Sequence, residues 1–106
     1  MFKVFISQPM RGRSDEEIIQ ERKEVEKFAQ QKFNDKQVII IDSFIKDAPT
    51  IEHPLWYLGK SLEYLSEADA AIFAPSWQKA RGCQIELLAC LFYDIPVYEM
   101  EEKEGD

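Results

Sequence analysis

Short apolar runs alternate with longer segments of helical periodicity along this 106-residue chain, and this alternation constrains the fold more than any other feature. The apolar runs cover residues 2–6, 38–41, 70–74 and 95–100, and the helical patterns cover residues 14–32, 54–66 and 82–93. Strands separated by helices pair in parallel through right-handed crossovers, which place helices on both faces of the sheet. The sequence therefore predicts a three-layer α/β fold with a four-stranded parallel sheet in the order 2-1-3-4.

Local signals add detail to this prediction. Ser14 and Glu17 form a capping box that starts the first helix. The stripe that follows predicts one buried helix face, made of Ile18, Val25, Phe28, Ala29 and Phe33. Residues 38–41 are continuously β-branched, which predicts a strand buried on both faces.

The third helical segment is apolar on two sides. One predicted face carries Ile85, Leu88, Ala89 and Phe92, and another carries Leu87 and Leu91. A helix with apolar residues on more than one side either lies deep in the protein or forms a contact between subunits.

Composition limits the class of protein. The length predicts one domain over residues 1–100, followed by an acidic tail over residues 101–106. A net charge of −7 argues against a protein that binds duplex nucleic acid, because such a protein needs a basic face. The apolar run at the N-terminus is too short for a signal peptide, and no run is long enough to span a membrane, so we expect a cytoplasmic protein with no membrane partner.

The two cysteines and the single histidine predict neither a disulfide nor a metal centre. Cys83 and Cys90 are seven residues apart on one predicted helix, which separates them by about 10 Å along its axis. A disulfide needs Cα atoms within roughly 7 Å, so we expect free thiols. His53 has no close cluster of soft ligands beside it in the sequence.

Two loops are expected to meet where the strand order reverses, between the first and third strands. Residues 7–13 follow the first strand and residues 75–82 follow the third. Open α/β sheets bind ligands in the crevice at such a switch point. Gly82 would let a ligand approach the backbone, and Glu86 stands one turn further along the helix. Glu86 is therefore either a nucleophile toward an anomeric carbon, as in retaining glycosyl transfer, or a partner of the helix dipole.

Other side chains near these loops are candidates for ligand contacts. Arg11 and Arg81 each precede a glycine, and they are either bidentate phosphate donors or surface arginines without a partner. Ser7 can donate to a ligand or bond within its own turn. Trp77 can stack on a base or sugar, or cover the neighbouring helix. Asp69 can contact the ligand or cap the turn before the third strand.

Three segments carry a resemblance to a known superfamily. They are Val-Phe-Ile-Ser-Gln-Pro-Met-Arg-Gly at residues 4–12, Ala-Asp-Ala-Ala-Ile-Phe at residues 68–73, and residues 77–89 followed by Ile-Pro-Val at residues 95–97. Gly82 stands four residues before Glu86 in the last of them. Together they resemble the nucleoside 2-deoxyribosyltransferase superfamily, most closely its short phage and bacterial branch and the deoxynucleoside 5′-monophosphate N-glycosidases. The resemblance covers residues 3–98.

The resemblance implies a flavodoxin-like fold and Glu86 as a nucleophile that forms a 2-deoxyribosyl intermediate. It also implies a phosphate-binding loop after the first strand, no cofactor, and a homodimer or larger homo-oligomer with sites near subunit boundaries. On this interpretation the catalytic residues are Glu86 and Asp69, and the substrate-binding residues are Ser7, Pro9, Met10, Arg11, Gly12, Trp77, Arg81 and Gly82.

Departures from the family pattern influence which activity we expect. Phe5 replaces a tyrosine that many members carry, Leu88 replaces a frequent glycine, and Asn34 is the only asparagine. These differences favour hydrolysis or binding over base exchange. The first hypothesis is an N-glycosidase or deoxyribosyltransferase-like enzyme acting on a nucleoside or its 5′-monophosphate. The alternatives are a non-catalytic nucleotide-binding protein, such as a sensor or sponge, and an interaction subunit with a vestigial crevice.

Overall fold

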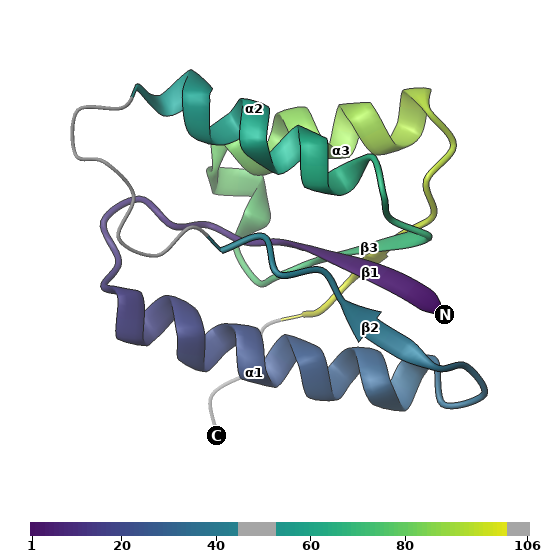
Figure 1. Cartoon of the computed structure of the whole chain (residues 1–106). Helices are drawn as coiled ribbons and strands as arrows, with labels where there is room; N and C mark the ends of the chain where they lie inside the picture. Colours follow the sequence, from purple (N-terminus) through teal and green to yellow (C-terminus); the bar gives the residue numbers. More distant parts are fainter. Residues whose placement is uncertain (45–52, 102–106) are drawn as a thin grey trace.

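A computed structural model describes residues 1–44 and 53–101, and these residues form the predicted three-layer α/β fold. Its four strands are all parallel, in the order β2-β1-β3-β4. Helix α1 covers one face of the sheet, and α2 and α3 cover the other, which is a flavodoxin-like arrangement (Figure 1). The strands are β1 (Phe2–Ser7), β2 (Val38–Ile40), β3 (Ala70–Phe73) and β4 (Val97–Glu99), and the helices are α1 (Asp15–Lys32), α2 (Pro54–Leu65), a short 3-10 helix η1 (Trp77–Lys79) and α3 (Arg81–Phe92). Residues 102–106 of the expected acidic tail lie outside the described residues.

The strands β1 and β3 form the centre of the core. Alternate side chains of a strand point to opposite faces of the sheet, and both faces are covered here. Val4 and Ile6 pack with Ile72 on the α1 side, whereas Phe5 packs with Phe73 on the side of α2 and α3. This alternation places the last residue of β1, Ser7, on the same side as Phe5.

Helix α1 begins at the predicted capping box. The Ser14 hydroxyl accepts a hydrogen bond from the Glu17 backbone N–H at 3.2 Å, and the Glu17 carboxylate reaches back to the Ser14 backbone. The helix buries Ile18, Val25 and Ala29, as its periodicity predicts, together with Arg22. An arginine within this stripe was not predicted.

Strand β2 departs from its prediction. As the predicted strand order requires, β2 lies at the edge of the sheet and pairs only with β1 within the described residues, but the predicted burial on both faces is not found. The side chain of Ile39 is 38% exposed, and Val38 and Ile40 are half-buried. A run of β-branched residues thus predicts the strand correctly, but it does not distinguish an edge position from a central one.

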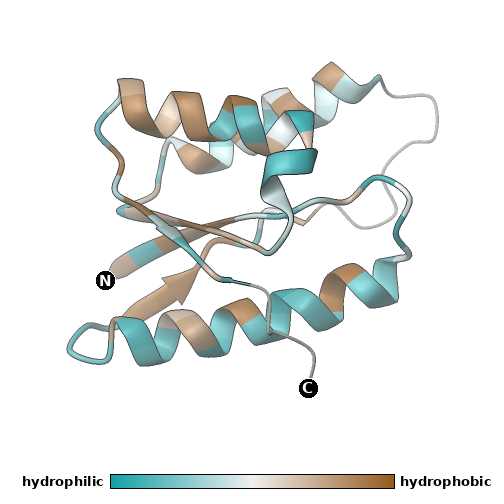
Figure 2. Ribbon diagram, turned by 180° about the vertical axis from the view of Figure 1, so that it is seen from behind, coloured by the Kyte–Doolittle hydropathy of each residue, from teal (hydrophilic) through white to brown (hydrophobic). Residues whose placement is uncertain are grey.

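The three buried residues of helix α3 belong to neither of the two apolar faces that the sequence predicts. Cys83, Glu86 and Cys90 are buried, at the helical spacing of one face. Of the predicted faces, Leu88 and Phe92 are 50% and 76% exposed. Figure 2 shows hydrophobic residues over much of α3, in contrast to the largely hydrophilic α1. Because two sides of α3 are apolar, the sequence left open which one packs inward.

None of the helices in residues 1–44 and 53–101 combines the length and apolar character needed to cross a bilayer. The same residues contain no cluster of three or more side chains suited to hold a metal ion. Cys83 and Cys90 are both buried free thiols.

Candidate active site

Ser7 and Glu86 are joined by a hydrogen bond at the carboxyl end of β1. The Ser7 hydroxyl donates to Glu86 Oε1 at 2.6 Å, and the two side chains are 1% and 6% exposed. Carboxylates are seldom buried this fully without a compensating partner. Strand alternation brings Ser7 to this side of the sheet, and the helical spacing of α3 turns Glu86 toward it. The predicted nucleophile and a predicted loop residue are therefore in direct contact.

A second serine reaches the same carboxylate from α2. Ser61 forms a side-chain hydrogen bond with Glu86 and is itself half-buried. Sequence analysis did not identify Ser61. The available signal was a serine between Leu58 and Leu62 in the apolar stripe of α2, at a position that favours an apolar side chain.

Burial changes the acidity of Glu86. Loss of solvent raises its pKa from 4.5 to about 7, and the hydrogen bonds from Ser7 and Ser61 oppose this rise because they favour the charged form. A carboxyl group with a pKa near neutrality exchanges its proton readily at physiological pH. Such a group is suited to acid–base or nucleophilic work.

The two buried thiols lie around the carboxylate. Burial raises the pKa of Cys83 and of Cys90 to about 11, and the charge of Glu86 contributes to both rises. Both thiols are therefore neutral at physiological pH and are poor nucleophiles. Ser7 also hydrogen-bonds Cys83, so its hydroxyl joins the thiol and the carboxylate. Among these groups, Glu86 is the one with a pKa suited to catalysis.

Space for a ligand lies one turn before Glu86 on α3. A methyl group built on Gly82 meets no heavy atom within 4 Å, apart from its chain neighbours and the helix backbone. Helical side chains lean toward the N-terminal turn, so the Glu86 side chain leans toward Gly82. The role of Gly82 in admitting a ligand stays a prediction, since a methyl group on Gly59 is equally unobstructed.

The Glu86 carboxylate is more enclosed than expected. The sequence predicts that it faces an open cleft, but its side chain is 6% exposed and it lines neither of the two cavities described below. The bonds from Ser7 and Ser61 hold it between the sheet and α2.

The loops after β1 and β3 face each other across a cavity of about 270 Å³, lined by Pro9, Arg13, Glu21, Pro75 and Ser76. This cavity confirms that the two loops meet. Its arginine, however, is Arg13, which donates to Glu21 Oε1 and to the Pro9 carbonyl oxygen, each at 2.9 Å. Arg11 is exposed and lines neither cavity.

The remaining loop residues shape this turn. Gly12 adopts φ +77°, a left-handed conformation that strains other residues, which explains a glycine here. Met10 is 37% exposed and, like Gly12, lines neither cavity. On the opposite side of the crevice, Arg81 is the exposed first residue of α3, a helix whose N-terminus has no side-chain cap and no acidic residue in its first turn.

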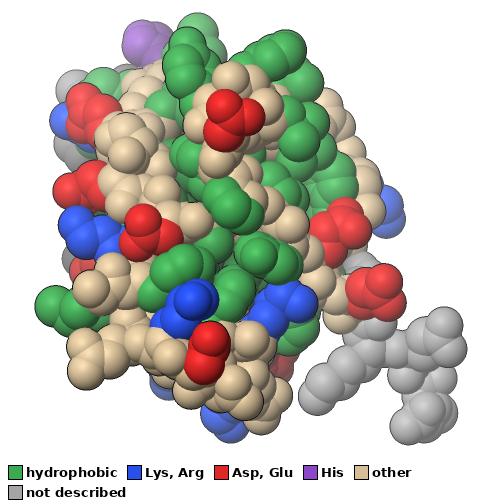
Figure 3. Space-filling view, turned by 90° about the vertical axis from the view of Figure 1, so that its right-hand side faces the viewer, with side chains coloured by type: hydrophobic (Ala, Val, Ile, Leu, Met, Phe, Trp, Pro, Cys, Tyr) green, Lys and Arg blue, Asp and Glu red, His purple; other side chains and the backbone are tan. Residues whose placement is uncertain are grey.

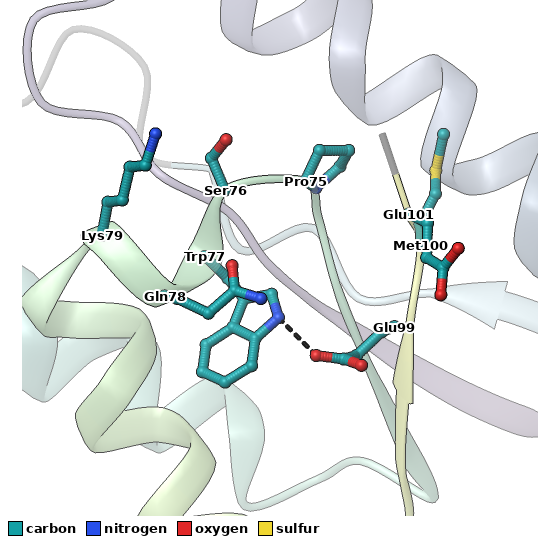
Figure 4. Close-up of a pocket in the computed structure, with 8 residues that line it drawn as sticks. All are labelled: Pro75, Ser76, Trp77, Gln78, Lys79, Glu99, Met100 and Glu101. Carbon is teal, nitrogen blue, oxygen red and sulfur yellow. Dashed lines mark hydrogen bonds between the residues drawn. The ribbon is translucent and has the colours of Figure 1, made fainter. Parts of the chain in front are cut away.

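Trp77 borders a larger cavity at the carboxyl ends of β3 and β4. The cavity measures about 360 Å³ and is lined by Pro75, Ser76, Trp77, Gln78, Lys79, Glu99, Met100 and Glu101. The indole Nε1 donates to Glu99 Oε1 at 2.7 Å, as Figure 4 shows. The ring also meets Phe73 edge to face, with centroids 5.4 Å apart. Trp77 thus both borders a cavity and packs on the core.

Asp69 lies at the opposite end of the sheet. Its carboxylate accepts a hydrogen bond from the Lys3 backbone N–H at 2.8 Å, beside the start of β1 and β3. Lys3 and Ser7 are four residues apart on one strand, about 13 Å. The structure therefore does not bring Asp69 to Glu86. The Asp69 carboxylate instead caps the backbone at the start of β1.

A buried polar network fixes the beginning of the loop after β1. The Gln8 amide donates to the Ile18 carbonyl oxygen at 2.9 Å and to Glu21 Oε1 at 3.0 Å. Arg22 donates to Gln8 Oε1 at 3.4 Å and to the Ile41 carbonyl oxygen at 3.3 Å. These contacts tie the ends of β1 and β2 to α1, so the position of Ser7 is well supported.

Comparisons with known proteins match this chain to no protein-family model, no curated protein and no solved structure.

Proposed function

We propose that this protein is an N-glycosidase or deoxyribosyltransferase-like enzyme that cleaves the N-glycosidic bond of a deoxynucleoside or its 5′-monophosphate. The observation that carries the proposal is the buried Glu86 carboxylate, held by Ser7 at 2.6 Å, with open space at Gly82 beside it. The motif resemblance described above supplies the substrate class.

In the proposed reaction the ionised Glu86 carboxylate attacks C1′ of the sugar. A glutamyl ester to C1′ forms while the C1′–N bond breaks, and the bond electrons leave with the base, which takes up a proton from solvent. Water then attacks C1′ and returns a proton to solvent, and Glu86 leaves as a carboxylate. Transfer would follow if a second base took the place of water. A sugar hydroxyl would take the place of the hydrogen bond from Ser61.

The 5′-phosphate would bind Arg11 and Arg81, which are both exposed. The uncapped N-terminus of α3 adds free backbone N–H groups beside Arg81. In contrast, the start of α1 is capped by Ser14 and carries three acidic residues in its first turn, which favours the α3 end for an anion.

Base release measures the proposed activity directly. Wild-type protein incubated with each deoxynucleoside and each 5′-monophosphate should release free base, detected by chromatography, and Glu86→Gln should release none. Absence of release from every substrate, or equal release by Glu86→Gln, would rule the proposal out.

A non-catalytic nucleotide-binding protein is the second candidate. The enclosure of Glu86, at 6% exposure, favours it. Calorimetry separates the two functions, because a binding protein takes up a nucleotide without releasing its base.

The proposed enzyme would act as a homodimer or larger homo-oligomer. Figure 3 shows hydrophobic side chains gathered over the part of the molecule where α2 and α3 lie. Large apolar side chains that are exposed on or next to these helices are Leu55, Trp56, Ile85, Leu88, Leu91, Phe92 and Tyr93. A contiguous apolar surface of this kind is typical of an interaction site.

A further inference from the structure

We propose that the cavity beside Trp77 and Glu99 binds the nucleobase, and that it selects a base with an exocyclic amino group at the edge farthest from the sugar. Cytosine and adenine carry such a group. The identity of the ligand rests on the proposed function, but the selectivity rests on the cavity and is tested by binding alone.

The sheet register places this cavity at a suitable distance from Glu86. Ser7 pairs with Phe73 and Phe73 pairs with Glu99, so the three residues form one row across β1, β3 and β4. Neighbouring strands lie about 4.8 Å apart, which puts the Cα atoms of Ser7 and Glu99 about 10 Å apart. Phe73 is fully buried between them, so a base attached to a sugar at Glu86 would reach Glu99 by lying beyond the carboxyl ends of the strands, over Phe73.

The cavity offers an aromatic surface and an acceptor together. The half-buried indole of Trp77 is fixed by its edge-to-face contact with Phe73 and by its 2.7 Å hydrogen bond to Glu99. A fixed indole loses little entropy when a flat ring stacks on it. The Glu99 carboxylate uses one oxygen for Trp77 and keeps further acceptor sites for a ligand.

The charge of the lining favours hydrogen-bond donors over phosphate. Two of the lining residues, Glu99 and Glu101, are carboxylates, and Figure 4 shows Lys79 extending away from the Trp77–Glu99 pair. Carboxylates accept hydrogen bonds and repel anions. The amino groups of cytosine and adenine donate, whereas uracil and hypoxanthine present a carbonyl acceptor at the same position.

Binding to a variant without the nucleophile tests the selectivity apart from the chemistry. The double variant Glu86→Gln, Trp56→Phe retains Trp77 as its only tryptophan, because the chain has two. Its fluorescence should be quenched by deoxycytidine at a concentration about 10-fold lower than by deoxyuridine. Deoxyadenosine and deoxyinosine form a second matched pair and should differ in the same direction.

Further substitutions assign the selectivity to Glu99. Adding Glu99→Gln should abolish or reverse the preference, because the amide can donate to a carbonyl. Glu67→Gln, which removes an exposed carboxylate beyond α2, is the matched control and should retain the preference for bases with an amino group. Equal affinity for the two members of a pair, or an unchanged preference in Glu99→Gln, would overturn the proposal.

The outcomes also separate this proposal from the proposed function. Selective binding by the variant without base release by the wild type would support the base subsite and remove the glycosidase. Base release by the wild type, together with equal binding of the two nucleosides of each pair, would support the glycosidase and remove the base subsite. Failure of every nucleoside to bind would remove the base subsite.

Discussion

The Ser7 hydroxyl and the Glu86 carboxylate meet at 2.6 Å, and this bond joins the end of β1 to the second turn of α3. It is a short, buried contact to a carboxyl group whose pKa is raised to about 7. The stability of the fold and the proposed chemistry are therefore linked through one titrating group.

The stability of the wild-type protein should fall between pH 5.5 and pH 8 because of Glu86. Its pKa is about 7 in the folded protein and 4.5 for an unperturbed glutamate, so the folded state binds the extra proton in this range. The stabilising contribution is complete below pH 4.5 and is lost as the pH rises through about 7. Chemical denaturation should show Glu86→Gln gaining about 2 kcal/mol relative to wild type between these pH values.

Glu67→Gln controls for the loss of one exposed carboxylate. A difference between Glu86→Gln and wild type that stays constant with pH would contradict the raised pKa.

Ser7→Ala should move the pH dependence of base release upward. Ser7 favours the charged form of Glu86, so its removal raises the pKa of that carboxyl group further. The midpoint of kcat against pH should increase, and kcat at pH 7 should fall about 10-fold. Ser66→Ala, which changes an exposed serine at the end of α2, is the control. An unchanged midpoint in Ser7→Ala would show that the bond does not tune Glu86.

Gly82→Ala should separate activity from stability. The added methyl group meets no protein atom within 4 Å, so the variant should fold with equal or slightly greater stability, by at most about 1 kcal/mol. The same methyl group occupies the approach to Glu86, so base release should drop at least 10-fold, a loss of about 1.4 kcal/mol in transition-state stabilisation. Kinetics and thermal unfolding measure the two effects.

Gly59→Ala is a matched control, since a methyl group at this position on α2 is equally unobstructed. It should leave base release unchanged. Full activity in Gly82→Ala would mean that the substrate does not approach along this side.

The phosphate contacts predict a selective change in KM. Arg11→Ala and Arg81→Ala should each raise KM for a 5′-monophosphate about 10-fold, the loss of one charged hydrogen bond, and leave KM for the matching nucleoside unchanged. Lys23→Ala, which removes an exposed charge from α1, is the control. Equal effects on both substrates would place these arginines outside the phosphate site.

The exposed face of α3 predicts self-association. Leu88→Lys and Leu91→Lys introduce charge on side chains that are 50% and 59% exposed, so the isolated subunit should still fold. Sedimentation should show an oligomer for the wild type and a monomer for the double variant. Ile39→Lys, at 38% exposure on the edge strand, is the control for added charge and should remain oligomeric. A monomeric wild type would refute the prediction.

Much of the fold follows from local sequence patterns. The capping box at Ser14 and the four apolar runs predict helix and strand positions because these signals depend on neighbouring residues only. The strand order follows from the alternation of strands and helices. The edge position of β2 is part of that order, but the exposure of Ile39 does not follow, since a continuous β-branched run predicts burial on both faces.

The candidate site is predicted in part. Glu86 and Ser7 were identified because they follow the ends of β3 and β1, and the topology brings those ends together. Ser61 was missed because its contact depends on how α2 packs against α3, which periodicity does not specify. The burial of Glu86 was missed for the same reason, since its carboxylate was expected to face an open cleft. Asp69 was assigned to the site, although a residue that precedes a strand lies at the amino end of the sheet, opposite the carboxyl ends where Ser7 and Glu86 meet.

Ser7, Phe73 and Glu99 form one row across the sheet. Because side chains alternate between the two faces of a strand, the position of Ser7 along β1 decides whether it faces Glu86. A deletion of one residue within β1 would exchange the two faces of the strand beyond that point. Gln8, which now contacts α1, would then replace Ser7 opposite α3. The length of β1 therefore sets which side chain reaches Glu86: a change of one residue turns the serine to the other face, and a change of two residues keeps its face but moves it about 7 Å along the strand.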